Sequence, residues 1–154
     1  MIRLVRTDSS NPGFIELVKH LDAELAFLDG EEHTFYSQFN KIDKIKHVVV
    51  ANLNKVPLAC GAIKVFDSKS MEVKRMFVLP EFRGKGIATK VLAELESWAS
   101  ELGYESCLLE TGKRQIEAIE LYRKSDYVTI SNYGQYVGID NSLCFEKKLN
   151  DKKI

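Results

Sequence analysis

Arg83-Gly84-Lys85-Gly86-Ile87-Ala88 is the stretch that decides the fold of this 154-residue chain. It separates a β-favouring run, 71–79, from a long segment with helical apolar spacing, 87–102. Its glycines allow backbone conformations that other residues avoid, and the first turn of the following helix presents N–H groups without partners inside the helix. These donors, together with the helix dipole, predict a site for an anion such as a pyrophosphate. A flexible loop with solvated Arg83 and Lys85 side chains is the alternative, and the flanking strand and helix favour the anion site over it.

The common phosphate loops do not fit this stretch. A Walker loop needs a hydroxyl residue directly after its lysine, and Gly86 follows Lys85 here. The dinucleotide fingerprint needs a third glycine where this chain has Thr89. The loop therefore indicates an anion site of another kind.

Periodicity on both sides of the loop predicts one α+β (mixed α/β) domain over 1–154, with a frayed tail at 150–154. Apolar spacing predicts helices over 12–29, 31–39, 87–102 and 113–124. Runs of β-favouring residues predict strands over 2–7, 47–51, 56–66, 71–79, 106–110, 127–130 and 143–149. The consecutive strands between 47 and 79 predict an antiparallel meander. The strand–helix–strand order from 71 to 110 predicts a parallel pair joined by the long helix.

Composition excludes several classes of protein. Apolar residues make up 45% of the chain, and 22 basic residues balance 22 acidic ones. A net charge of zero gives no electrostatic basis for binding nucleic acid or an anionic membrane. The chain has no signal-peptide pattern at its start and no apolar run long enough to span a membrane, so we expect a soluble, cytoplasmic protein. Cys60, Cys107 and Cys144 form no C-x-x-C pair, which predicts neither a disulfide framework nor a zinc site.

Three motifs together resemble the GNAT family, the acetyl-CoA-dependent N-acetyltransferases. Arg83-x-x-Gly86-x-Ala88 resembles the family's R/Q-x-x-G-x-G/A signature, and Met76-Phe77-Val78-Leu79-Pro80 precedes it as the family's cofactor-binding strand would. Gln115-x-x-Ala118-x-x-x-Tyr122 is similar to the family's N-x-x-A-x-x-x-Y helix, with Gln in place of Asn. The order of elements from 2 to 149 also fits. The resemblance implies the GNAT fold: a mostly antiparallel twisted sheet with helices on both faces, whose parallel strands, 71–79 and 106–110, splay apart around the cofactor.

The resemblance implies acetyl-CoA as the acyl donor, with no metal. In the family, the pantetheine arm fills the gap between the splayed strands and bonds to the backbone like an extra strand. This assigns pantetheine to Met76, Phe77, Val78 and Gln115, with the Val78 amide facing the thioester carbonyl. The pyrophosphate is assigned to the backbone of Arg83, Gly84, Lys85, Gly86, Ile87 and Ala88.

Two residues are the catalytic candidates that the resemblance implies. Tyr122 matches the family tyrosine that donates to the departing CoA thiolate, although an ordinary helix aromatic is the alternative. A tyrosine of pKa near 10 would protonate a thiolate of pKa near 8.5 uphill by about 2 kcal/mol, which favours hydrogen-bond stabilisation over full transfer. An alkylammonium acceptor, with a pKa of about 10.4, must first lose a proton. Glu72 matches the family's general-base position; a solvated strand residue paired with Lys74 is the alternative, and Glu110 competes for the role.

The acceptor site is the least determined by sequence. Family members build it from the first helices and the C-terminal strands, which points to Glu31, Glu32, Tyr36, Tyr133 and Tyr136. The adjacent carboxylates would attract an amine, although a solvated helix start explains them equally well. We expect direct transfer, in a ternary complex, to the primary amine of a small molecule. A peptide or protein amine as acceptor, or a non-catalytic acetyl-CoA sensor, are the alternatives, and a homodimer is left open.

Asp126 departs from the family pattern, since relatives often have Gly there before an aromatic residue. The end of a helix at this position favours a positive φ, which Asp tolerates better than most residues. We expect a modest cost in stability and no loss of function.

Overall fold

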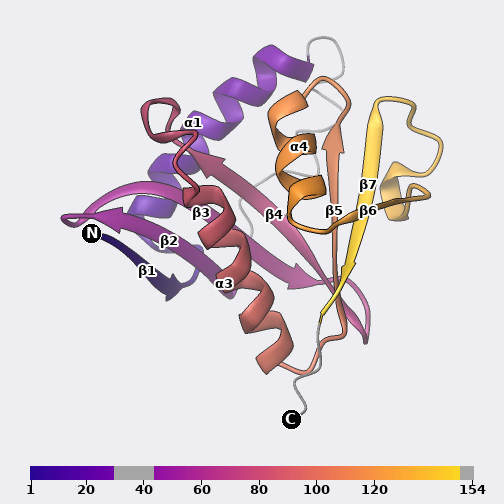
Figure 1. Ribbon diagram of the computed structural model, residues 1–154, viewed down its shortest axis with the longest axis horizontal. Coiled ribbons are helices and arrows are strands. Elements are labelled where there is room, and N and C mark those ends of the chain that lie inside the picture. The colour runs from indigo at the N-terminus through magenta and orange to yellow at the C-terminus, as the bar shows by residue number, and fades with distance from the viewer. Residues whose placement is uncertain (30–43, 150–154) are drawn as a thin grey trace.

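The computed structural model describes residues 1–29 and 44–149, so the helix predicted over 31–39 and the tail at 150–154 lie outside it. Its centre is a seven-stranded mixed sheet in the order β1-β2-β3-β4-β5-β7-β6 (Figure 1). The strands are β1 (Ile2–Thr7), β2 (His47–Leu53), β3 (Val56–Val65), β4 (Ser70–Val78), β5 (Ser106–Gly112), β6 (Val128–Ile130) and β7 (Ser142–Lys148). The helices are α1 (Pro12–Asp29), α3 (Ile87–Glu101) and α4 (Ile116–Lys124), with 3₁₀ turns at Pro80–Phe82 and Gly134–Tyr136.

Local chemistry places the helix starts and turns. The Asn11 side chain accepts the Phe14 N–H at 3.0 Å, which caps the start of α1. The β2–β3 turn places Asn54 and Lys55 at φ of 52° and 70°, the pair of positive angles that suits a two-residue hairpin. The helix predicted over 113–124 is wrong in its first turn. Strand β5 continues to Gly112, and a turn closed by the Gln115 N–H and the Gly112 carbonyl at 3.0 Å follows it, so α4 begins only at Ile116.

The sheet has helices on both faces, as predicted. Successive residues of β2 alternate between two clusters of buried side chains, because neighbouring strand residues point to opposite faces. Val49 and Ala51 join the cluster that contains α3 and α4, whereas Val48 and Val50 join the cluster that contains α1. The chain therefore has a hydrophobic core on each side of one sheet.

Strands β4 and β5 are parallel and splay apart, as predicted. Their pairing is limited to Ser70–Glu72 against Ser106–Leu108. Beyond it, β5 continues to pair with β7 while β4 continues to pair with β3, so a gap opens between them. The meander of β2, β3 and β4 is antiparallel, and the crossover through α3 makes the parallel pair. This gap is the feature of the fold that positions the site.

Asp126 follows α4 and has a φ of 74°, which confirms the predicted left-handed conformation. We expect Asp126→Gly to raise the free energy of unfolding by about 0.5–1 kcal/mol, because Gly removes the steric cost of a positive φ. Denaturant unfolding monitored by fluorescence measures the change. Asp126→Ala is the control, since it keeps the strained angle and should destabilise the protein. Equal or lower stability of the glycine variant would contradict the prediction.

None of the helices in the described ranges is long and apolar enough to cross a membrane.

All three cysteines are buried and carry free thiols. Burial raises the pKa of the Cys60 and Cys107 thiols to about 12, which keeps both protonated and unreactive.

Candidate active site

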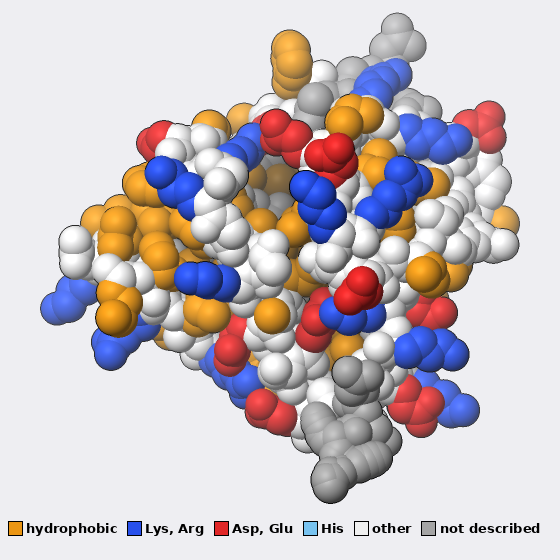
Figure 2. Space-filling view, in the orientation of Figure 1, with side chains coloured by type: hydrophobic (Ala, Val, Ile, Leu, Met, Phe, Trp, Pro, Cys, Tyr) orange, Lys and Arg blue, Asp and Glu red, His pale blue; other side chains and the backbone are white. Residues whose placement is uncertain are grey.

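A cavity of about 700 Å³ occupies the gap where β4 leaves β5. Its walls come from α1, the C-terminal part of β4, the loop before α3, and α4, and Figure 2 shows the hollow on this face of the molecule. Every residue predicted to bind the cofactor except Lys85 lines it: Met76, Phe77, Val78, Arg83, Gly84, Gly86, Ile87, Ala88 and Gln115. The fold therefore brings together three sequence motifs that are separated along the chain.

The loop has the backbone geometry that an anion site requires. Gly84 and Gly86 both have a φ of 80°, and a Cβ on either would meet nothing within 4 Å. Glycine stands there because of the backbone angle, not because of crowding. Gly86 caps α3, and its carbonyl accepts the Lys90 N–H at 3.2 Å as the first bond of the helix. The N–H groups before Lys90, in the first turn of α3, consequently have no acceptor within the helix and are available to a ligand.

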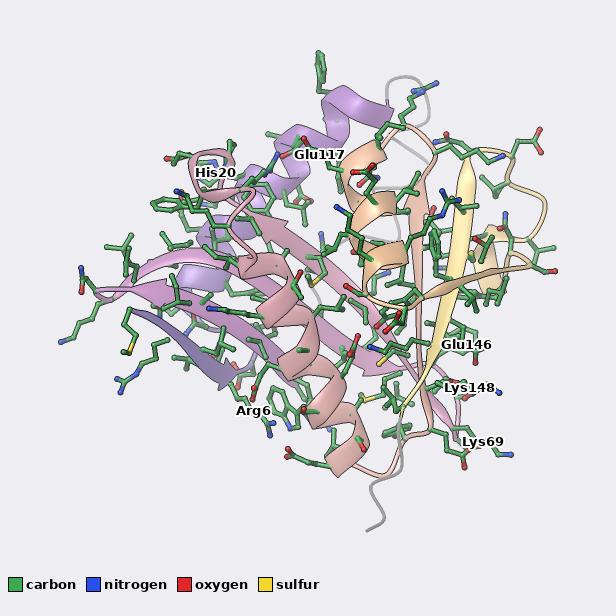
Figure 3. All side chains as sticks on the ribbon, viewed as in Figure 1. Arg6, His20, Lys69, Glu117, Glu146 and Lys148 are labelled. Atoms are coloured by element: carbon green, nitrogen blue, oxygen red, sulfur yellow. The ribbon has the colours of Figure 1, made fainter. Side chains whose placement is uncertain are left out.

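The Arg83 side chain is bound to neighbouring groups and is not the solvated side chain that the flexible-loop alternative predicts. Its Nε donates to the Val78 carbonyl at 2.8 Å, and its Nη2 donates to Oε1 of Glu24 in α1 at 2.7 Å. A longer contact of 3.9 Å reaches Glu117 of α4, which is labelled in Figure 3. The guanidinium also lies over the Phe77 ring, 5.3 Å from its centroid. Arg83 thus ties the loop, β4 and the two helices together across the larger cavity.

The Val78 amide faces the gap. The Leu79 N–H bonds to the Leu58 carbonyl of β3 at 2.9 Å, and N–H groups of successive strand residues point to opposite sides. The Val78 N–H therefore points away from β3, toward the space that β5 has vacated. Its side chain is buried against the α3 side of the sheet.

A smaller cavity of about 80 Å³ adjoins the larger one. The two share five lining residues: Leu21, Leu25, Met76, Gln115 and Tyr122. The smaller cavity adds polar and charged side chains that the larger one lacks: Glu72, Lys74, Arg75, Glu110, Thr111 and Tyr136. The predicted catalytic residues Glu72 and Tyr122 therefore line one continuous space.

Tyr122 is held at the junction of the two cavities. It is 6% exposed and packs against Tyr127 and Phe145, with ring centroids 5.8 and 6.1 Å away. Burial, and secondarily the Glu110 carboxylate, raises the pKa of Tyr122. The side chain is therefore a neutral hydroxyl, able to donate a hydrogen bond, over the working pH range.

Glu72 is buried, at 7% exposed, so the alternative is wrong in placing it in solvent, although its pairing with Lys74 is present. The Tyr133 hydroxyl donates to its Oε2 at 2.8 Å, and Lys74 Nζ lies 4.0 Å from its Oε1. Burial raises the pKa of Tyr133, and the neighbouring Glu72 carboxylate raises it further. Tyr133 thus holds the carboxylate of Glu72, and its predicted contact with the acceptor stays a prediction.

The other acceptor candidates have different outcomes. Tyr136 is 2% exposed and lines the smaller cavity. Glu110, the rival general base, also lines it and accepts a hydrogen bond from the Ser142 hydroxyl at 2.7 Å. Glu31, Glu32 and Tyr36 lie outside the described residues. Sequence reasoning did not place Lys74 and Arg75 at the site. The signal that would have found them is an adjacent pair of cations inside an otherwise buried strand.

Comparison with known proteins agrees with this geometry. The model of the acetyltransferase (GNAT) family matches residues 14–127. An IAA acetyltransferase of Azospirillum brasilense is 31% identical over 150 residues, which span 96% of this chain and 98% of that protein. A Klebsiella pneumoniae structure assigned as an acyl-CoA N-acyltransferase superposes with a TM-score of 0.81 at 25% identity, covering 97% and 99% of the two chains. A GNAT acetyltransferase from Elizabethkingia anophelis, solved with acetyl-CoA bound, shares the fold with a TM-score of 0.67 at 15% identity, covering 96% and 98%.

The family match covers every residue that lines the two cavities except Tyr136, and the Azospirillum relative aligns along nearly the whole chain. The signature loop, the splayed parallel strands and the tyrosine-bearing helix stand together in one site. The chain belongs to the GNAT family of acetyltransferases.

Proposed function

We propose that this protein transfers the acetyl group of acetyl-CoA directly to the primary amine of a small molecule, within a ternary complex. The observation that carries the proposal is the meeting of two cavities at Tyr122. The larger cavity suits an extended cofactor, and the smaller, charged cavity suits the acceptor. An amine in the smaller cavity would reach a thioester in the larger one without a covalent enzyme intermediate.

The backbone around the larger cavity would hold acetyl-CoA. The N–H groups at the start of α3 are suited to the pyrophosphate, because helix N-termini favour anions. The exposed edge of β4 would pair with pantetheine, and Gln115 at the start of α4 would contact it. The Val78 N–H would polarise the thioester carbonyl and stabilise the oxyanion of the tetrahedral intermediate.

Glu72 would accept the proton of the acceptor ammonium, directly or through water. The neutral amine then attacks the carbonyl carbon, forming the C–N bond, and the C–S bond breaks with its electron pair on sulfur. The nitrogen still carries one surplus proton, which passes to the departing thiolate, directly or through water, and leaves a neutral amide and the CoA thiol. The hydrogen bond from Tyr133 keeps the Glu72 carboxylate in one orientation for this step. Glu110 is the rival base, because it lines the same cavity on the neighbouring strand.

Tyr122 would donate a hydrogen bond to the departing thiolate. Burial raises the pKa of Tyr122 above its usual value, so full proton transfer to a thiolate of pKa near 8.5 is uphill by more than about 2 kcal/mol. A charge-assisted hydrogen bond requires no such transfer and gains strength inside a buried site. The role of Tyr122 is thus stabilisation of the leaving group.

Release of free thiol from acetyl-CoA across a panel of primary amines tests the proposal. We expect amine-dependent release, and we expect acetyl-CoA alone to raise the melting temperature. Binding of acetyl-CoA without release on any small amine, peptide or protein substrate would favour the sensor alternative. If acetyl-CoA neither binds nor releases thiol, the proposed function is overturned.

A matched pair of glycine variants tests the loop itself. Gly86 and Gly103 stand just before and just after α3, with φ of 80° and 94°, and a Cβ on either meets open space. Replacing either with Ala should cost similar stability, about 1–2 kcal/mol from the positive φ. Only Gly86→Ala should also weaken acetyl-CoA binding, measured by calorimetry. Equal affinity in both variants would remove the loop from the cofactor site.

Two sequence-based expectations stay predictions: the single domain over 1–154 and the cytoplasmic location. The oligomeric state, which the sequence left open, stays open. Among the residues that the structure describes, no group of His, Cys, Asp and Glu side chains is arranged to hold a metal ion.

A further inference from the structure

We propose that the acceptor carries a carboxylate beside its amine, as a small α-amino acid does. The inference rests on the proposed function and names the substrate class of the same site. Its basis is the set of charges that line the smaller cavity: Glu72 and Glu110 are acidic, and Lys74 and Arg75 are basic. Two negative and two positive side chains face one small space.

A bulge in β4 brings the two cations to the same face of the sheet. Cys60 pairs with Phe77 and Ala62 pairs with Lys74, so the single residue Gly61 stands opposite both Arg75 and Met76. Arg75 takes a φ of 61°, which a side chain adopts only at a cost. A Cβ on Gly61 would lie 2.5 Å from Met76 Sδ, which explains why glycine occupies the position facing the bulge.

The bulge shifts the alternation of the strand by one residue. Val73 belongs to the core on the α3 side, whereas Phe77, four residues later, belongs to the core on the α1 side. In a regular strand these two residues would share a face, and Lys74 and Arg75 would point apart. Here Arg75 reaches Asp22 of α1 at 3.2 Å while Lys74 lies 4.0 Å from Glu72. The backbone strain therefore places a pair of positive charges beside the general-base candidate.

These charges are buried, so their arrangement discriminates between acceptors that carry different charges. The Arg75 side chain is 2% exposed and the Lys74 side chain 11% exposed. Burial lowers the pKa of Lys74, whereas the Glu72 and Glu110 carboxylates act in the opposite direction. An acceptor that is only cationic would be attracted by the glutamates and repelled by Lys74 and Arg75. An acceptor with one ammonium and one carboxylate matches both pairs, because opposite charges attract strongly at low dielectric.

Thr111 gives an independent sign of a polar ligand. It is 4% exposed, lines the smaller cavity, and its hydroxyl has no hydrogen-bond partner among the residues that the structure describes. A buried hydroxyl without a partner costs free energy, and such groups are normally satisfied by a ligand or water. A carboxylate oxygen would accept a hydrogen bond from it.

The first test uses the wild-type protein. Thiol release from acetyl-CoA is measured with the common amino acids, each paired with its amide, which keeps the amine and removes the negative charge. The less basic amine of the amide gives the amide more free amine at neutral pH, so reactivity alone favours the amide. We expect at least one amino acid to have a kcat/KM about tenfold or more above that of its amide.

The second test removes one cation. Lys74→Met keeps the length of the stem and should lower kcat/KM for the preferred amino acid by about 10- to 100-fold, with little change for its amide. A change in the neighbouring base would affect both acceptors alike. The ratio of kcat/KM for the amino acid to kcat/KM for its amide therefore reports the carboxylate contact. Lys69→Met is the control. Lys69 is exposed, precedes β4 at the end far from the bulge, and is labelled in Figure 3.

The outcomes separate this inference from the function on which it rests. Release with neutral or polycationic amines, but no preference for any amino acid over its amide, overturns the inference and leaves the acetyltransferase intact. A preference that Lys74→Met leaves unchanged also overturns the assigned contact. Failure of acetyl-CoA to bind, seen by calorimetry without any acceptor, counts against the proposed function itself.

Discussion

Tyr122→Phe should lower kcat by about 100- to 1000-fold while leaving the affinity for acetyl-CoA unchanged, because it removes one donor to the charge that develops on sulfur. The ring stays in place against Tyr127 and Phe145, so the packing of the site is preserved. Burial raises the pKa of Tyr122, so the hydroxyl remains protonated throughout the usual assay range. The loss in kcat should therefore be the same at every pH.

Tyr127→Phe is the matched control for this variant. Tyr127 is also buried, at 3% exposed, but its hydroxyl donates to Glu96 at 3.0 Å and it lines neither cavity. Losing that hydrogen bond should cost about 1 kcal/mol of stability and leave kcat close to that of the wild type. Steady-state kinetics and calorimetric binding of acetyl-CoA measure the two variants. If both variants lose the same activity, the Tyr122 hydroxyl has no special role.

Glu72→Gln should lower kcat/KM by about 100-fold or more at neutral pH, since proton removal by a positioned base contributes that much. The wild type can bind the abundant ammonium form and deprotonate it in the complex. The variant must use amine that is already neutral, a fraction that grows about tenfold per pH unit below an amine pKa of about 10.4. The deficit should therefore shrink as the pH rises toward that value.

Glu110→Gln, the same substitution on the neighbouring strand, decides between the two carboxylates. Both glutamates line the smaller cavity, but only Glu72 is held by Tyr133. We expect the pH-dependent deficit in Glu72→Gln alone. The same deficit in Glu110→Gln alone would transfer the role to Glu110. Full activity in both variants would leave water as the acceptor of the proton.

Several parts of the fold followed from local sequence signals. The Asn11 cap, the hairpin at Asn54 and Lys55, and the positive φ at Asp126 depend on the chemistry of a few neighbouring residues. Helical spacing predicted α3, and the strand–helix–strand order predicted that β4 and β5 are parallel. The cap, the hairpin, the positive φ and the helix are readable because each depends on contacts close along the chain, whereas the parallel pairing follows from the order of the elements. The start of α4 was misplaced because β5 continues to Gly112, where it pairs with Ser142, 30 residues away, and a turn follows before the helix.

By itself, the sequence determined the loop geometry at Gly84 and Gly86, the gap between the splayed strands, and the family to which the chain belongs. Only the tertiary structure decided the surroundings of the catalytic candidates. Tyr133 binds Glu72 across 61 residues of sequence, and Arg83 binds Glu24 across 59. The strained backbone at Arg75, which puts two cations beside the smaller cavity, depends on the register between β3 and β4. Periodicity records which face of its own element a residue occupies, whereas burial and charge pairing depend on which other elements pack against that face.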